Sequence, residues 1–190
     1  MRYNCIRKSR RLPLKKLIHL VMEGTRTEPQ YFSIFRSDEY VLKFHKNRRN
    51  ETSPKGLVKR AVSVEKEDGL SNADQIWIVS DKDNWTDEHF KALKVWLLKP
   101  QHFHALSNPS FEYWLLLHFE DTGVSSQDDC LNRLKKYLQG YDKNLDIKVF
   151  TPKLIEKAVL RAKKRNDNAD GNCFDYQGST VYKLVEVLLG

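Results

Sequence analysis

Two aspartates follow a short apolar run near the middle of the chain. Ile76–Val79 is an unbroken run of β-branched and aromatic side chains, and Asp81 and Asp83 come almost directly after it. An apolar run of this length is typical of a strand covered on both faces, as in a parallel sheet. A chain that leaves such a strand can aim two side chains, two residues apart, in the same direction. Because ligand sites in open α/β sheets lie beyond the carboxyl ends of the strands, this pair predicts a metal site.

Two glutamates occupy comparable places elsewhere in the chain. Glu23 follows another apolar run, Leu17–Met22, and Glu112 lies in the first turn of an expected helix that follows a strand over 101–106. If the first and third strands are neighbours, Glu23 converges with the two aspartates where the strand order reverses. Hard oxygen donors without supporting cysteine suit Mg²⁺ or Mn²⁺. Such a site could polarise a phosphate and activate a water molecule, with Glu112 as a fourth ligand or general base.

Each of these acidic residues also has a structural interpretation. Asp81 and Asp83 could form a turn before a helix capped by Thr86. Glu23 could be solvated, and Glu112 could favour the positive end of a helix that begins at Asn108 and Pro109. Both interpretations stay open from the residues alone.

The apolar pattern predicts an α/β fold in which four strands alternate with helices. Ser53 followed by Pro54 marks the start of one helix, which Gly69 ends, and Thr27 is expected to cap another. The alternation predicts a mainly parallel sheet with right-handed crossovers. The expected strands cover 17–22, 39–45, 76–79 and 101–106, and the expected helices follow Thr27 or cover 54–68, 86–99 and 111–119.

The strand pattern ends after about Asp121, and helices are expected over 128–138, 152–166 and 180–189. A chain of 190 residues can bury a sizeable core. We therefore predict one domain in three parts: a basic N-terminal arm (1–14), an α/β core (15–120) and a helical C-terminal part packed on that core (121–190).

The composition favours a soluble protein with a polyanionic partner. The net charge is +8, from 33 basic and 25 acidic residues, and an excess of this sign favours nucleic acid. The N-terminus lacks the apolar region of a signal peptide, which predicts a cytoplasmic protein without a membrane partner. Cys5, Cys130 and Cys173 are too widely spaced to indicate a disulfide framework or a zinc knuckle. No phosphate-binding G-x-x-x-x-G-K-[ST] loop is present, so the chain is not itself an ATPase of that class.

Basic residues near the expected site and on one helix are candidates for nucleic-acid contacts. A stripe of basic side chains at helical spacing is usually a solvated face, but it can also follow a phosphate backbone. No motif that reads bases is present, so neither DNA nor RNA is favoured. The candidates are Arg26, Lys46, Arg48, Arg49, Lys82, Lys157 and Arg161.

The histidines inside the expected strands favour packing over metal binding. His19 is expected to be a hydrogen-bonded core residue of the first strand. His102 and His104 share one face of the fourth strand, away from its acidic end.

Four segments in this order resemble the RloB family, a Toprim-like group encoded in bacterial defence and restriction–modification loci. The resemblance spans residues 15–190 and leaves only the basic arm outside. The D-x-D pair alone is unspecific, but the ordered set is specific. The segments are E-G-T-R-T-E-P-Q-Y-F (Glu23–Phe32), V-S-D-K-D (Val79–Asp83), S-N-P-S-F-E-Y-W-L-L-L-H-F (Ser107–Phe119) and S-T-V-Y-K-L-V-E (Ser179–Glu186).

The resemblance implies a Toprim core and a Mg²⁺-dependent nuclease that acts as an effector in anti-phage defence. In that pattern Glu23 serves as acid/base and metal ligand, Asp81 and Asp83 hold Mg²⁺, and Glu112 lies in the family's own motif. A partner of the ABC-type ATPase class, similar to RloA, is implied as well. The alternative is a catalytically inactive Toprim-like module that binds nucleic acid or protein. One departure from the family concerns substrate handling: Lys46–Asn50 is basic where members often carry a second glycine-rich loop.

Overall fold

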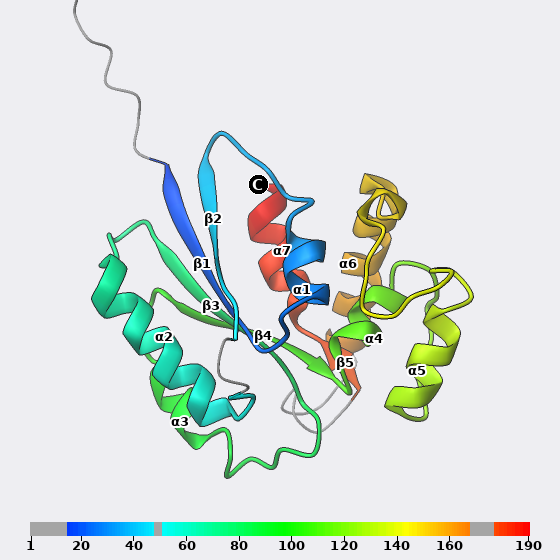
Figure 1. The fold of residues 1–190 in the computed structure, drawn as a ribbon, viewed down its shortest axis with the longest axis horizontal. Coiled ribbons are helices and arrows are strands. Elements are labelled where there is room, and N and C mark those ends of the chain that lie inside the picture. The colour runs from blue at the N-terminus through cyan, green and yellow to red at the C-terminus, as the bar shows by residue number, and fades with distance from the viewer. Residues whose placement is uncertain (1–14, 48–50, 168–176) are drawn as a thin grey trace, which may run out of the picture.

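A five-stranded, mostly parallel sheet with helices on both faces forms the protein (Figure 1). The computed structural model describes residues 15–47, 51–167 and 177–190, so the predicted basic arm lies outside the described residues. The strand order is β2-β1-β3-β4-β5, and β4 and β5 alone pair antiparallel within that sheet. The strands are β1 (Lys16–Met22), β2 (Tyr40–His45), β3 (Gln75–Asp81), β4 (His102–Asn108) and β5 (Gly178–Ser179).

The predicted α/β class and the four parallel strands are confirmed, and the strand count is corrected from four to five. β5 contains one glycine and one serine, so it has no apolar pattern from which a strand could have been predicted. Residues after 121 therefore contribute one short edge strand besides their helices. The helices are α1 (Thr27–Phe32), α2 (Pro54–Asp68), α3 (Lys91–Trp96), α4 (Phe111–Leu116), α5 (Gln127–Leu134), α6 (Pro152–Asp167) and α7 (Val181–Leu189), with a 3-10 helix η1 (Ile147–Val149).

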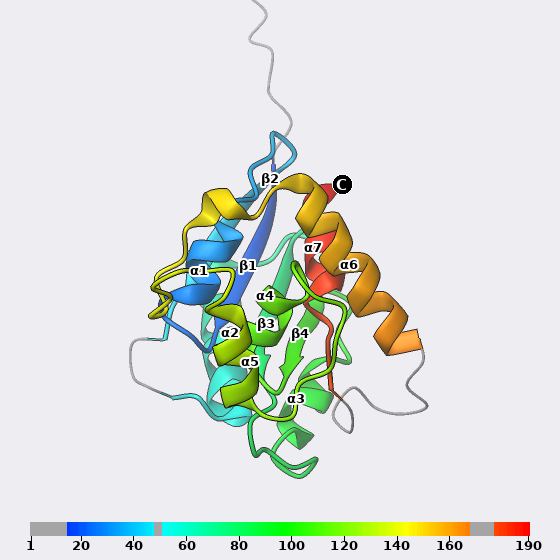
Figure 2. The ribbon, with the colours of Figure 1, turned by 90° about the vertical axis from the view of Figure 1, so that its right-hand side faces the viewer.

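The side chains of each central strand alternate between two hydrophobic clusters. Ile18, Leu20 and Met22 belong to the larger cluster, while Val21 and Ile76 belong to the smaller one. Figure 1 shows α2 and α3 on one side of the sheet and the other helices opposite them. Figure 2 shows α6 beside α7 on that second side. The larger cluster contains side chains of α1 and of α4 to α7, so helices of the first and last thirds share one core.

The first and third strands are neighbours, as the site prediction requires. β1 pairs in parallel with β3, and β3 pairs in parallel with β4. The carboxyl ends of all three strands therefore meet at the same edge of the sheet. The order along the sheet changes direction at β1, because the chain moves from β1 outward to β2 and then returns past β1 to β3.

Three of the expected helix starts are wrong. α1 begins at Thr27 itself, whose hydroxyl lies 3.2 Å from the hydroxyl of Tyr141 rather than capping the helix. α3 begins only at Lys91, because Thr86 pairs with His89 in a preceding turn. α4 is preceded by Ser110 at the N-cap position, not by Asn108. Thr27 and Thr86 each use, in a tertiary contact or a turn, the hydroxyl that local sequence assigned to the cap.

The start of α2 follows the sequence rule, and it offers a test of the scaffold. The Ser53 hydroxyl accepts a hydrogen bond from the Gly56 N–H at 3.1 Å, with Pro54 in the first turn. We expect Ser53→Ala to cost about 1 kcal/mol of unfolding free energy, which lowers the melting temperature by about 2–4 °C in a chain of this size. Ser63→Ala, on the exposed face of the same helix, is the matched control and should change little. Equal melting temperatures for both variants would contradict this role of the cap.

None of the helices in the described part of the chain is long and apolar enough to cross a membrane.

Candidate active site

The carboxyl ends of β1 and β3 are joined through Glu23. The Glu23 N–H donates to the Val79 carbonyl at 3.0 Å, and the Glu23 carboxylate accepts from the Asp81 N–H at 3.1 Å. This pair of contacts fixes the two predicted ligands relative to each other. It is a direct consequence of parallel pairing between the two strands.

Asp83 lies in a loop that is tied to the end of β4. The N–H groups of Lys82 and Asp83 donate to the carbonyls of Ser107 and Pro109 at 2.8 and 3.4 Å. Asp83 has a φ of 43°, in the left-handed region that side chains other than glycine seldom adopt. Strained backbone of this kind is concentrated at functional sites, where the surrounding structure holds it in place.

A cavity of about 850 Å³ opens where these strand ends meet. Carboxylates from the ends of β1 and β3 and from the start of α4 lie on its wall. The structure therefore brings together all four acidic residues that the sequence singled out. They are Glu23, Asp81, Asp83 and Glu112.

Three further carboxylates line the same cavity and were missed by the sequence reasoning: Glu28, Asp128 and Asp142. Glu28 is only 7 % exposed, and its carboxylate accepts a hydrogen bond from the Gly24 N–H at 2.9 Å. A Cβ on Gly24 would lie 2.0 Å from one Glu28 oxygen, so the glycine is needed for this close approach. Glu28 looked like an ordinary acidic residue in the first turn of a helix. Its place in the Glu23–Phe32 motif was the one available signal.

Burial and mutual repulsion raise the pKa values of these acids. The pKa of Glu23 is raised to about 7, mainly by burial and also by the charges of Asp83 and Glu28, while the hydrogen bond from the Asp81 N–H opposes the rise. Burial raises the pKa of Asp81 well above its usual range, with further contributions from Glu28, Glu23 and Glu112. The pKa values of Glu28 and Asp83 are also raised, mainly by burial. The cavity therefore gathers more negative charge than the protein alone solvates well.

The raised pKa of Glu23 gives a pH-dependent stability that can be measured. The folded state binds the Glu23 proton more tightly than the unfolded chain, so the free energy of unfolding falls as the pH rises from about 4.5 to about 7. We expect Glu23→Gln to melt a few degrees higher than the wild type at pH 8 without divalent metal, and at nearly the same temperature at pH 4.5. Glu67→Gln, at an exposed position of α2, should give a difference that does not change with pH. A pH-independent difference for Glu23→Gln as well would contradict the shift.

The C-terminal part of the chain closes the cavity on one side. The Tyr141 hydroxyl donates to the Glu112 carboxylate at 3.1 Å, and burial raises the pKa of this phenol. Gln127 and Leu131 of α5 also line the wall, as do the basic side chains of Lys135 and Lys143. These residues lie far from the acidic motifs in sequence and belong to no recognisable motif. Their position on the cavity wall could therefore not be predicted from the sequence.

The predicted nucleic-acid contacts are only partly brought to the cavity. Arg26 lines it and donates to the Asn144 side chain at 2.7 Å. Lys82 bonds to the Trp85 carbonyl, and Arg161 donates to the Leu117 carbonyl at 2.7 Å, so both serve contacts within the fold. The remaining candidates are not gathered there by the structure: Lys46 and Lys157 are exposed side chains outside the cavity wall, and Arg48 and Arg49 lie outside the described residues.

The histidines of β4 are packed inside the fold, as expected, and His19 is packed as well. His102 stacks on Trp96 and pairs with Glu65, while His104 lies 2.9 Å from the Ser80 hydroxyl. His19 is fully buried and hydrogen-bonded to His45, which confirms the expected core position.

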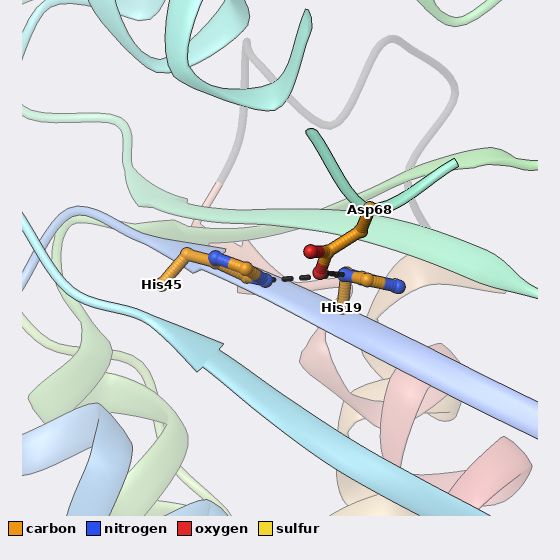
Figure 3. Close-up of side chains that lie close together, drawn as sticks. All are labelled: His19, His45 and Asp68. Carbon is orange, nitrogen blue, oxygen red and sulfur yellow. Dashed lines mark hydrogen bonds and ion pairs between the residues drawn. The ribbon is translucent and has the colours of Figure 1, made fainter. Parts of the chain in front are cut away.

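Among the described residues, one group of three side chains is close enough together to hold a metal ion without rearrangement. The nitrogen and oxygen atoms of His19, His45 and Asp68 lie within 4.8 Å of one another (Figure 3). No three cavity carboxylates meet that spacing among the described residues. The cavity carboxylates nevertheless fit a hard divalent cation, because their oxygens are crowded together and their pKa values are raised.

Comparisons with known proteins point to one family. A family model described as RloB-like protein matches residues 18–188, which is nearly the whole chain. Neither the curated proteins nor the solved structures gave a significant match.

Proposed function

Because the chain belongs to the RloB-like protein family, we propose that it is a Mg²⁺-dependent phosphodiesterase that hydrolyses nucleic acid. One observation carries this proposal: five carboxylates from the ends of neighbouring parallel strands and the helices after them line one cavity. Carboxylates with raised pKa values in a cleft are typical of catalytic or metal-binding sites. The Toprim-like identity of the core, taken from the resemblance, is part of the same proposal.

Asp81 and Asp83 are the proposed main metal ligands, with Glu23 and Glu112 completing the set. When bound, Mg²⁺ would polarise the scissile phosphate and offset the negative charge of the carboxylates. A carboxyl with a pKa near 7 can both give and accept a proton at physiological pH, which suits Glu23 for general acid/base catalysis. The Tyr141 hydroxyl holds the Glu112 carboxylate in position.

Three basic side chains on the cavity wall would receive the phosphates. Arg26, Lys135 and Lys143 line the same cavity as the acidic cluster, and the chain carries a net charge of +8. Such groups neutralise a phosphate backbone without reading its sequence. We therefore propose a substrate recognised through its backbone, either DNA or RNA.

The direct test is a cleavage assay with the double variant Asp81→Ala, Asp83→Ala. Purified wild type should cleave at least one of duplex DNA, single-stranded DNA, RNA or tRNA in millimolar Mg²⁺, and the double variant should not. Asp87→Ala with Glu88→Ala is the matched control: it removes the same charge from exposed residues that pair with lysines outside the cavity. Equal cleavage by a folded double variant would refute the catalytic proposal.

A non-catalytic binding module is the second candidate, and the three basic side chains on the cavity wall are the observation that favours it. In that case nucleic acid binds with an affinity that falls as salt rises, with no dependence on divalent metal. The same panel separates the two functions, because only the first predicts metal-dependent products.

The family resemblance extends the proposal to a biological role. We propose that hydrolysis serves anti-phage defence and that an ABC-type ATPase acts as partner. Phage protection by cells that express the chain with such an ATPase should be lost in the double variant. Protection that survives the loss of both aspartates would separate the defence role from the cavity.

A further inference from the structure

A second cluster of possible ligands lies between the sheet and α2. His19 comes from the middle of β1, His45 is the last residue of β2, and Asp68 is the last residue of α2. Figure 3 shows the two imidazoles directed toward each other, with the carboxylate beside them. None of the three residues lines the carboxylate cavity. We call these three residues the His–His–Asp cluster.

The local fold explains why the three residues meet. β1 and β2 pair in parallel, with His19 opposite Lys43 and Val21 opposite His45. Residues two apart in a strand share a face, so His19 and His45 both lie on the face that α2 covers. α2 ends at Asp68 because Gly69 follows with a φ of 64°. The Asp68 carboxylate therefore lies beside the imidazole rings of His19 and His45.

The distances within the cluster match those between ligands of a tetrahedral metal ion. His19 Nδ1 lies 3.1 Å from His45 Nε2 and 3.5 Å from Asp68 Oδ2. Bonds of about 2.0–2.1 Å, as in zinc sites, give a tetrahedron with edges of about 3.3 Å. We propose that His19 Nδ1, His45 Nε2 and Asp68 Oδ2 bind one Zn²⁺ ion, with water as the fourth ligand. Two imidazoles and one carboxylate are a donor set that zinc accepts.

The surroundings of the cluster are compatible with a metal ion. His19 Nδ1 and His45 Nε2 face each other at 3.1 Å, so each ring presents a nitrogen whose lone pair can bind a metal when the imidazole is neutral. His19 is fully buried, whereas the Asp68 side chain is about 30 % exposed, so an ion can enter from the solvent side. The Nε2 of His19 is buried and has no hydrogen-bond partner among the described residues, which leaves Nδ1 as the atom through which this ring interacts with them.

A lysine competes with the ion for the carboxylate. The Lys43 ammonium lies 3.0 Å from the same Asp68 oxygen. An ion at the cluster would have to share this oxygen with Lys43 or displace the ammonium. Removal of the lysine charge should therefore strengthen zinc binding, an effect that a purely structural histidine–histidine hydrogen bond does not produce.

The proposed ion would fasten β2 to α2. β2 lies at one edge of the sheet, and His45 lies two residues before Asn47, which lines the carboxylate cavity. A bound Zn²⁺ would thus hold the segment that leads into the cavity wall. This role does not depend on the proposed hydrolysis.

The test is a titration of the EDTA-treated full chain with ZnCl₂, followed by calorimetry and thermal melting. The wild type should bind one equivalent at this cluster and melt at a higher temperature with zinc. His45→Gln and Asp68→Asn should lose that equivalent, and Lys43→Met should bind more tightly than the wild type. Both replaced ligands are partly exposed, so these variants should fold. Co²⁺ as a probe should give the visible absorption of a tetrahedral site in the wild type and not in His45→Gln.

A control variant separates this cluster from the carboxylate cavity. Glu23→Gln with Asp81→Asn leaves the three ligands intact and should keep the zinc equivalent. Zinc binding that persists in both His45→Gln and Asp68→Asn, or a wild type that takes up no zinc, would overturn the proposal. Failure of the cleavage assay would leave it untouched, because no cavity carboxylate is a ligand here.

Discussion

Asp81→Asn is expected to abolish Mg²⁺-dependent hydrolysis and, without metal, to raise the melting temperature of the protein. Burial and the surrounding carboxylates raise the pKa of Asp81 well above its usual range, so its charged form is unfavourable in the metal-free fold. Asparagine keeps the shape and removes that charge, so the metal-free fold should gain several degrees at pH 8. Loss of a ligand worth several kcal/mol in the transition state lowers the rate by about a thousandfold. Stability and activity should therefore change in opposite directions.

Melting curves in EDTA and cleavage rates in Mg²⁺ measure the two effects. Asp87→Asn, which removes the same charge from an exposed position, is the control and should change neither quantity appreciably. An Asp81→Asn protein that is both less stable and fully active would contradict this account of the cavity.

Leu116→Ala is expected to be among the most destabilising single changes. Leu116 is fully buried in the larger hydrophobic cluster, on the helix that also carries Glu112. A buried leucine replaced by alanine loses transfer free energy and leaves a cavity, at a cost of about 2–5 kcal/mol. The melting temperature should fall by roughly 5–15 °C.

Denaturant unfolding of the variant and of a matched leucine measures this cost. Leu98→Ala makes the same chemical change at a side chain that is 82 % exposed, so its free energy of unfolding should stay within about 0.5 kcal/mol of the wild type. Similar losses for both leucines would mean that α4 does not anchor the core.

The sequence was sufficient for the elements whose signals are local. Apolar runs located the four long strands, and Ser53 with Gly69 located the ends of α2. The place of Glu23 and Asp81 at the ends of adjacent strands followed from parallel topology, which alternating strands and helices predict. These signals need no knowledge of distant contacts.

Other features depend on tertiary contacts that one sequence does not encode locally. β5 exists because two residues pair with the end of β4, and its composition carries no strand signal. Glu28 reads as a helix-start acid until Gly24 brings its carboxylate into the cavity. Tyr141 and Lys143 reach the wall across more than a hundred residues of chain. The His–His–Asp cluster likewise needs strand register and helix length before its members can be paired.

The most direct test of the carboxylate cavity is a crystal structure of the full chain with Mn²⁺, recorded at the manganese absorption edge. The proposed function predicts an anomalous peak within ligand distance of Asp81 and Asp83, with Glu23 or Glu112 completing the shell. A peak confined to other parts of the molecule, or none in the cavity at millimolar Mn²⁺, would contradict it.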